Sequence, residues 1–408
     1  MRQQSPGADI DTTVPAVVLR SQRAGFPQHG VLGVVRTLGR LGVHVVLASP
    51  TAGGIAGSSR YVAGWESWEP HDADDPGALV GLRRVGETHE GAILLPTDDL
   101  SAVLVDAHAE ALRDVFRLPS IAAGVLPGLV DKLSLAERCE HAGGRAPATA
   151  AVSDLDEAEA FVARVAMPVV VKADLATLVA GVGRSVTIAT SREEVFDAVR
   201  AADGRRILLQ EHIPGDPRRV NWMFDGYLDA GSVCRFGATG RKTGQYPAYS
   251  GMATSAVSER NDEVARVALA LLQDVGYVGP VDVDLRHDER DGRYKIVDVN
   301  PRVGGTFRLF VAPNGMDVVR AAYLDLTGQG VPASSVPDGR SWLVETHVAA
   351  SGVAYRRDGW ITAGAWIRSL AGVDEGALFS LDDPRPMLGA TGHAAARAIG
   401  RLGRPTRG

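Results

Sequence analysis

Two stretches of alternating apolar and polar residues constrain the fold of this chain more than any other feature. Residues 281–285 read VDVDL and residues 296–300 read IVDVN, and a charged stretch containing Gly292 separates them. A period of two residues is typical of a β-strand with one buried face. Because glycine suits a tight turn, the pattern predicts two antiparallel strands joined as a hairpin.

The predicted hairpin gathers oxygen-bearing side chains on one face. Asp282 and Asp284 point the same way, and Asp298 and Asn300 point together on the partner strand. Such oxygens suit Mg²⁺, and nucleotide phosphates and water would complete its octahedral coordination. Repulsion between the carboxylates would be costly without a cation. The hairpin therefore predicts a metal site and leaves open whether Asp282 or Asp284 is the first acidic ligand.

Strands alternate with helical patterns over the first part of the chain. Apolar runs such as 14–19 and 92–95 are followed by helical periodicity at 31–41 and 100–115. This alternation predicts an open parallel sheet over residues 12–118. The segment contains no GxGxxG motif, so dinucleotide binding is not indicated.

Two further segments carry candidate nucleotide contacts. Lys172 closes the apolar strand PVVVK, and the loop after it contains Gly181 and Gly183, so this segment can hold a phosphate. Strand-end lysines often only extend toward solvent, and that alternative stays open. The sequence ILLQEHIPG predicts a strand entering a hinge, where backbone groups and Glu211 can pair with an adenine edge. An ordinary strand end is the alternative.

Composition excludes several classes of protein. A length of 408 residues predicts two or three compact units, and a net charge of −6 gives no sign of a nucleic-acid-binding face. Two cysteines cannot form a disulfide framework or a cysteine-rich zinc site. No apolar run approaches the ~20 residues that span a bilayer, and the N-terminus lacks the apolar stretch of a signal peptide. We expect a cytoplasmic protein with no membrane partner.

The motifs in their order resemble the ATP-grasp superfamily: Lys132, the PVVVKA segment, a glycine-containing loop, QEHIPG, and the VDVD and VDVNPR strands. The resemblance implies a fold of the α/β and α+β classes. An N-terminal open parallel-sheet domain (12–118) would precede an ATP-grasp domain (119–325), whose two α+β subdomains sandwich ATP. The lid subdomain would span about 145–208, and residues 326–408 would form an extension packed on this body.

The same resemblance implies a role for each matched residue. Lys132 and Lys172 would contact phosphates, and the loop 176–185, with its glycines, would close over them. Arg302 would steady an acyl phosphate. The expected adenine and ribose contacts are Glu211, His212, Ile213 and, as a guess, Asp216; the expected metal ligands are Asp284, Asp298 and Asn300. Asp284 is preferred to Asp282, because Asp282 lies farther from the turn than the usual ligand does.

A narrower resemblance points to the carboxylate–amine ligase branch, which includes D-aspartate ligases and natural-product amino-acid ligases. It lies in RKTGQYP, Gly251, NPRVGG and the DDPRP segment at 382–386. Arg241 and Lys242 are candidate anchors for a substrate carboxylate, since an arginine fork matches a carboxylate; a structural ion pair is the alternative. Three departures matter: the hinge continues as DPRR from Asp216 without an obvious ribose-binding acid, the loop 173–183 is unusually apolar, and Asp298 replaces the more usual glutamate.

The resemblance implies an ATP-dependent, ADP-forming ligase that joins a small carboxylate to an amine. ATP and Mg²⁺ would be its cofactors, with Mn²⁺ as a substitute for Mg²⁺. A thiol or carrier-protein acceptor is one alternative, and a nucleotide-binding regulator without turnover is another. The expected partners are small molecules, and a homodimer is left open.

Overall fold

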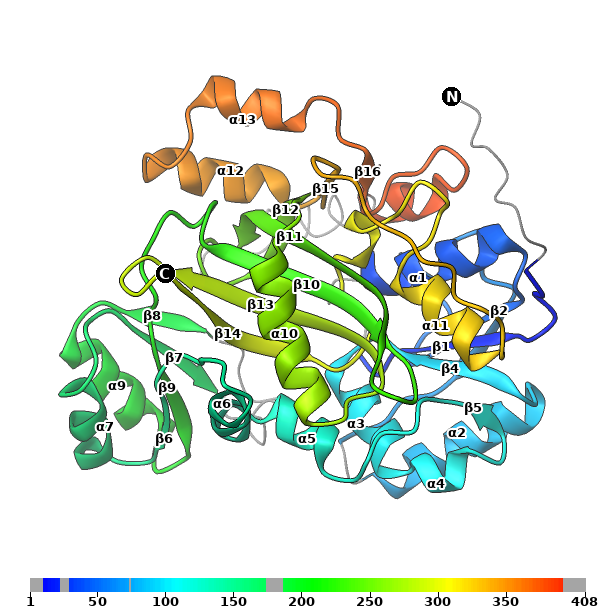
Figure 1. Ribbon diagram of the computed structural model, residues 1–408, viewed down its shortest axis with the longest axis horizontal. Coiled ribbons are helices and arrows are strands. Elements are labelled where there is room, and N and C mark those ends of the chain that lie inside the picture. The colour runs from blue at the N-terminus through cyan, green and yellow to red at the C-terminus, as the bar shows by residue number, and fades with distance from the viewer. Residues whose placement is uncertain (1–9, 23–28, 73–74, 174–185, 392–408) are drawn as a thin grey trace, which may run out of the picture.

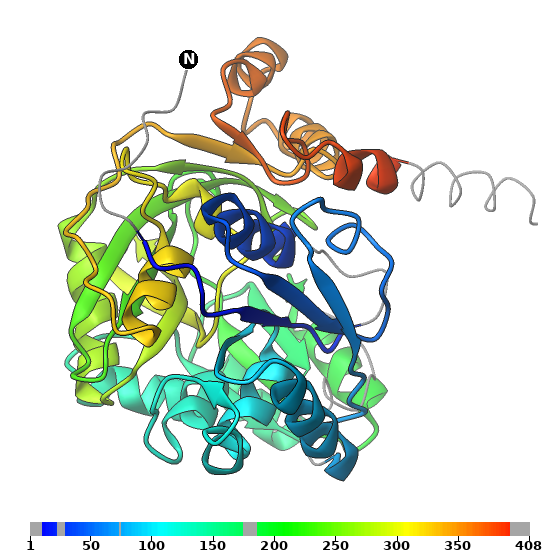
Figure 2. The same cartoon turned by 90° about the vertical axis from the view of Figure 1, so that its right-hand side faces the viewer.

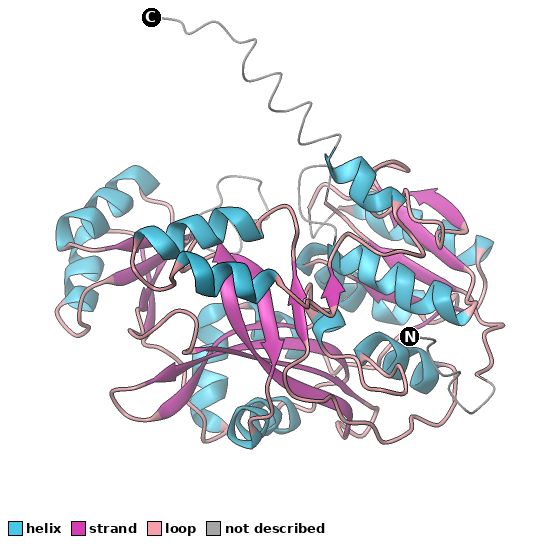
Figure 3. Cartoon of the chain, turned by 90° about the horizontal axis from the view of Figure 1, so that it is seen from above, coloured by secondary structure: helices cyan, strands magenta, loops and turns pink. Residues whose placement is uncertain are grey.

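The computed structural model describes residues 10–22, 29–72, 75–173 and 186–391. Their strands form three sheets, and the sheets lie side by side along the long axis of the molecule (Figures 1 and 3). A four-stranded sheet with its helices lies at one end and a five-stranded sheet at the other. A seven-stranded sheet lies between them.

The N-terminal unit is an open parallel sheet of order β3-β2-β1-β4-β5. Its strands β1 and β4 are completely buried apart from Pro96, because helices cover both faces. This confirms the fold predicted for this part of the chain. Its elements are β1 (Ala16–Leu19), α1 (His29–Leu41), β2 (Val45–Ser49), β3 (Gly64–Ser67), α2 (Pro76–Thr88), β4 (Ala92–Pro96), α3 (Asp99–Ala107), α4 (Ala109–Leu112) and β5 (Phe116–Arg117).

One predicted helix in this unit was wrong in its extent. The helix expected over 100–115 is divided into α3 and α4 at His108, and the chain then turns into β5. The division lets Phe116 pair beside Ala92 of β4, where its ring is almost completely buried.

The four-stranded sheet is antiparallel, with order β6-β9-β7-β8, and it carries two helices and a core of its own. The helices α5 (Val125–Val130) and α6 (Lys132–His141) precede it, and the Asp131 side chain caps α6 by accepting a hydrogen bond from Ser134 N. The elements of this unit are β6 (Thr149–Val152), α7 (Leu155–Val162), β7 (Val169–Ala173), β8 (Thr187–Ala189), α9 (Arg192–Ala202) and β9 (Ile207–Glu211).

The seven-stranded sheet has the order β14-β13-β10-β11-β12-β15-β16, and α10 (Asp262–Asp274) packs on it. Two of its strands, β13 and β14, are the predicted hairpin: Asp282 lies opposite Asn300, Asp284 lies opposite Asp298, and Gly292 has a φ of +68° in the turn. The strands are β10 (Asn221–Leu228), β11 (Cys234–Tyr246), β12 (Met252–Ser258), β13 (Gly279–Asp288), β14 (Arg293–Asn300), β15 (Ser341–Leu343) and β16 (Glu375–Gly376).

The C-terminal segment, residues 335–391, contributes strands to this sheet and also contacts the N-terminal unit. Its strands β15 and β16 extend the sheet, and Asp383 accepts hydrogen bonds from Arg36 of α1. Figure 2 shows α1, in dark blue, beneath the orange and red C-terminal segment. The remaining elements are η1 (Phe307–Leu309), α11 (Val318–Leu326), α12 (Val348–Arg357) and α13 (Ala363–Leu370). None of the helices in the described ranges is long and apolar enough to cross a membrane.

Candidate active site

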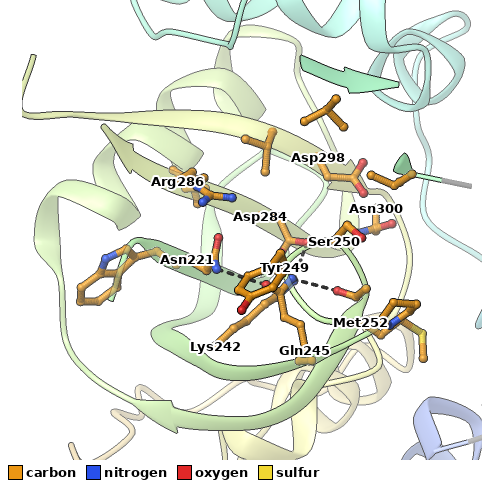
Figure 4. Close-up of a pocket in the computed structure, with 18 of the residues that line it drawn as sticks. Asn221, Lys242, Gln245, Tyr249, Ser250, Met252, Asp284, Arg286, Asp298 and Asn300 are labelled. Atoms are coloured by element: carbon orange, nitrogen blue, oxygen red, sulfur yellow. Dashed lines mark hydrogen bonds and ion pairs between the residues drawn. The ribbon is translucent and has the colours of Figure 1, made fainter. Parts of the chain in front are cut away.

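A cavity of about 530 Å³ lies where the four-stranded and seven-stranded sheets face each other (Figure 4). Its two ends differ in chemistry. The β7 and β9 end is lined by Val170, Lys172, Ile188, Gln210, Glu211, His212 and Ile213, and the opposite end by His29, Arg302, Gly305 and Thr306. The connection between β11 and β12 and its flanking residues add Tyr246, Tyr249 and Met252 to the lining. Acidic and basic residues of β11, β13 and β14 lie between these ends.

The predicted hairpin supplies the acidic centre of the cavity. The pairing of Asp284 with Asp298 directs both carboxylates into it, together with Asn300 and Asp282. A bulge follows this pair, because Leu285 lies opposite Ile296 and leaves Val297 extra on β14. The bulge explains why the consecutive residues Val297 and Asp298 both line the cavity.

Two partly buried lysines form ion pairs with two of these carboxylates. Lys242 Nζ donates to Asp284 Oδ2 at 2.6 Å, and Lys132 forms an ion pair with Asp298. Burial opposes the charge of Asp298, but Lys132 and Lys172 outweigh it and lower the pKa of this carboxyl. Lys172 donates to Gln210 at 2.8 Å, and burial lowers its pKa to about 8.

Asp282 and Asp225 form no ion pair with a lysine or arginine among the described residues. Burial and then the charge of Asp284 raise the pKa of Asp282 to about 7. Asp225 lies opposite Asp282 on β10, is completely buried, and has a pKa raised well above its ordinary value by burial and then by Asp282. One carboxylate oxygen of each has no hydrogen-bond partner among the described residues.

The donor set fits a hard cation that is held jointly with phosphates. In the described ranges, no three His, Cys, Asp or Glu side chains gather closely enough to hold a metal by themselves. Mg²⁺, however, usually takes only one or two protein carboxylates and completes its shell with phosphates and water. Asp284, Asp298 and Asn300 offer two carboxylates and an amide oxygen, and Asp282 adds an oxygen with no hydrogen-bond partner among the described residues.

The hinge end of the cavity combines apolar walls with polar groups. Ile213 is almost completely buried, and Val170, Ile188 and Val297 form apolar surface near it. His212 lines the cavity with an Nδ1 that has no partner among the described residues, and burial lowers its pKa to about 4. Glu211 does not point freely into the cavity, since Arg290 binds its carboxylate at 2.5 Å.

Arg302 lies at the other end of the cavity and connects the end of β14 to the N-terminal parallel-sheet unit. It donates to Asn300 Oδ1 at 3.1 Å and to Asp99 Oδ1, at the start of α3, at 2.7 Å. Burial opposes its charge, but Asp99 and Asp282 outweigh this effect and raise its pKa.

The structure does not bring every predicted residue into the cavity. Arg241 points away: its guanidinium binds Glu259 at 2.7 Å and lies over the Trp222 ring, as in the structural alternative. Asp216 is not among the lining residues and instead accepts from Arg218 N at 2.9 Å. Lys132 reaches the centre only through Asp298. Gly181, Gly183 and the loop 176–185 lie outside the described residues.

The cavity residues that the sequence analysis missed include Arg286, Tyr249 and His29. The signal for Arg286 was available, because the period of two that places Asp282 and Asp284 on one face also places Arg286 there. Tyr249 and His29 carry no comparable local pattern. Their positions follow from how the loop after β11 and the start of α1 meet the large sheet.

Comparison with known proteins identifies the central part of the chain. Residues 129–306 match the model of the ATP-grasp domain family. They form an ATP-grasp domain. The three-sheet arrangement has the same fold as solved ATP-grasp proteins, although sequence identity to them is low.

Two solved structures illustrate the fold that this chain shares with other proteins. The N5-carboxyaminoimidazole synthetase of Staphylococcus aureus complexed with ADP superposes with a TM-score of 0.63 at 11% identity, over 86% of this chain and 87% of that one. The L-amino acid ligase of Bacillus licheniformis superposes with a TM-score of 0.59 at 15% identity, over 81% and 79% of the two chains.

One curated relative is detected from sequence. A D-aspartate ligase of Enterococcus faecium is 24% identical over 255 residues, which are 59% of this chain and 60% of the relative. The match therefore spans about 60% of the length of that ligase.

Proposed function

We propose that this ATP-grasp protein is an ADP-forming ligase that activates a small carboxylate with ATP and joins it to an amine. The observation that carries the proposal is the pairing of Asp284 with Asp298 beside Asn300 and Arg302, at the centre of the cavity. The D-aspartate ligase and the L-amino acid ligase support an amino acid or amino-acid-like compound as one substrate.

The hinge end suits the base of the nucleotide and the acidic centre suits its phosphates. The apolar walls near Ile213 can enclose a flat ring, and the backbone of residues 211–213 can pair with its edge. Lys172 offers positive charge to a phosphate, because its hydrogen-bond partner among the described residues is the neutral amide of Gln210. Mg²⁺ or Mn²⁺ held by Asp284, Asp298 and Asn300 would offset negative charge on the phosphates.

The remaining residues position the reacting groups. Lys132 and Lys242 form ion pairs with Asp298 and Asp284, so the acidic centre is preorganised. Arg302 presents a fixed cation at the end opposite the hinge, where a carboxylate can approach the terminal phosphate. In the described part of the chain, neither cysteine lines the cavity, so activation does not require an enzyme thiol.

The proposed reaction has two steps. A carboxylate oxygen of the substrate attacks the γ-phosphorus of ATP, and the bond to the β-phosphate oxygen breaks to release ADP and leave an acyl phosphate. The amine nitrogen then attacks the acyl carbon, phosphate leaves, and the nitrogen loses a proton. Both steps depend on positioning and electrostatics rather than on a covalent enzyme intermediate.

The test is an ADP-release screen of amino acids, singly and in pairs, with products identified by mass spectrometry. With ¹⁸O in the substrate carboxylate, we expect one labelled oxygen in the released phosphate. Formation of AMP and pyrophosphate, or unlabelled phosphate under tight coupling, would overturn acyl-phosphate chemistry. Offering amines and thiols as acceptors identifies the class of bond that is formed.

A pair of variants ties the activity to the acidic centre. Asp298→Asn removes the charge that Lys132 and Lys172 share, so turnover should fall by at least about 100-fold and its Mg²⁺ requirement should rise. Glu289→Gln, at an exposed position of the hairpin turn, is the control and should keep normal turnover.

A further inference from the structure

Arg286 differs from the other basic residues that line the cavity. Lys242 is paired with Asp284, Arg302 with Asp99, and Lys172 donates to Gln210. Arg286 forms no ion pair or side-chain hydrogen bond within the described residues, and its buried Nε has no partner there. A desolvated cation without a counter-charge is unfavourable, because Coulomb attraction does not offset the lost hydration.

The position of Arg286 relates it to two parts of the site. It follows Asp284 by two residues on β13, so the two side chains share a face and lie roughly 7 Å apart along the strand. Both are labelled along this strand in Figure 4, and both line the cavity. On its other side, Arg286 lies within electrostatic range of His212 of the hinge, whose pKa is lowered first by burial and then by the charge of Arg286.

A second polar group without a partner lies at the same place. His212 Nδ1 is buried and has no hydrogen-bond partner among the described residues, although the ring lines the cavity. Asn221, which pairs with Arg286 across β10 and β13, also lines the cavity, but its amide is already bonded to Pro217 O and Gln245. Two unsatisfied groups side by side indicate a ligand with hydrogen-bonding capacity between the hinge and the acidic centre.

We propose that Arg286 binds a phosphate of the nucleotide, at the base-proximal end of the phosphate chain. This inference rests on the proposed function, which places the base at the hinge and the metal at Asp284. A phosphate bound between them neutralises the unpaired guanidinium and can accept two parallel N–H bonds from its fork. Arg286 thus acts in nucleotide binding, while Lys242 and Lys132 hold the metal ligands in place.

The experiment measures ADP binding by calorimetry in the presence of Mg²⁺, for the wild-type chain, Arg286→Gln and the control Arg293→Gln. Arg293 is an exposed arginine of the same hairpin that does not line the cavity. We expect Arg286→Gln to weaken ADP binding about tenfold or more, and Arg293→Gln to leave it unchanged. Adenosine, measured by its competition with ADP, should bind wild type and Arg286→Gln equally.

Thermal unfolding without ligand separates this role from a structural one. Because Arg286 is partly buried and meets no counter-charge among the described residues, Arg286→Gln should unfold at the same temperature as the wild type or higher. A lower unfolding temperature, unchanged ADP affinity, or an equal loss of adenosine affinity would each overturn the inference. Absence of ADP binding to the wild-type chain would instead overturn the proposed function.

Discussion

Arg302 and Asp99 join the parallel-sheet unit to the ATP-grasp domain through a single ion pair. Arg302 Nε lies 2.7 Å from Asp99 Oδ1, and the two residues are 203 positions apart in the sequence. The remaining donors of Arg302 bind Asn300 Oδ1 and Val303 O. Asp99 therefore fixes the direction of a guanidinium that also contacts a candidate metal ligand.

Asp99→Asn should impair use of the carboxylate substrate while sparing ATP binding. Losing the charge of Asp99 frees the Arg302 fork to turn, so kcat/KM for the carboxylate should fall about tenfold, with little change in the KM for ATP. Asp99→Glu should restore part of the loss. Asp114→Asn, which disrupts a much more exposed pair with Arg83, is the control. Equal losses for both substrates would contradict this role.

Gly304→Ala should disturb Asp282. A Cβ at position 304 would lie 2.7 Å from Asp282 Cβ and 2.9 Å from its Oδ2, so the loop or the carboxylate must move. We expect a loss of about 1–3 kcal/mol in the free energy of unfolding, together with a higher Mg²⁺ requirement. Urea unfolding and Mg²⁺ titration of ADP release measure the two effects. Gly330→Ala, where nothing lies within 4 Å, should change neither quantity.

Tyr249→Phe should alter substrate binding, because Tyr249 lines the cavity. Tyr249 has a φ of +72°, which is unfavourable for a side chain of this size, and its hydroxyl donates to Asp358 at 2.5 Å. Removing the hydroxyl should cost about 1 kcal/mol of stability and raise the KM of a substrate other than ATP.

A matched control exists for Tyr249. Tyr294→Phe also removes one hydrogen bond, from Asn261, at a residue that does not line the cavity. Both variants should lose similar stability in thermal unfolding. If their kinetics were also alike, Tyr249 would have only a structural role.

Asp383→Asn should destabilise the whole chain. Asp383 is completely buried and accepts from Arg36 Nε at 3.0 Å, Ser59 Oγ at 2.7 Å and Arg60 N at 3.0 Å. Without the negative charge of Asp383, the buried guanidinium of Arg36 has no counter-charge, which costs about 3–5 kcal/mol in the free energy of unfolding.

Denaturant unfolding tests this prediction against a neighbouring pair. Asp382 binds Arg40 at 2.9 Å, but both side chains are at least 30% exposed, so Asp382→Asn should cost about 1 kcal/mol or less. Similar midpoints for the two variants would show that the buried pair with Arg36 does not fasten the C-terminal segment to α1.

The sequence alone determined the β13–β14 hairpin and the parallel sheet. Both depend on local patterns, because a period of two residues fixes which face each side chain occupies. The sheet face occupied by Asp284, Asp298 and Asn300 followed from that period. The same period also gives the face occupied by Arg286. The extent of the helix expected over 100–115 was not fixed in this way, since burial of Phe116 against β4 decided where it ended.

Only the tertiary structure decided which charged groups are already paired. Arg241 and Lys242 are adjacent in the sequence, yet Glu259 of the strand-end loop binds one and Asp284 binds the other, inside the cavity. Lys132 reaches Asp298 across 166 positions, whereas Arg286 meets no carboxylate in the described ranges. Ion pairing depends on distances of a few ångströms in space, and residue spacing along the chain does not specify such distances between different strands and helices.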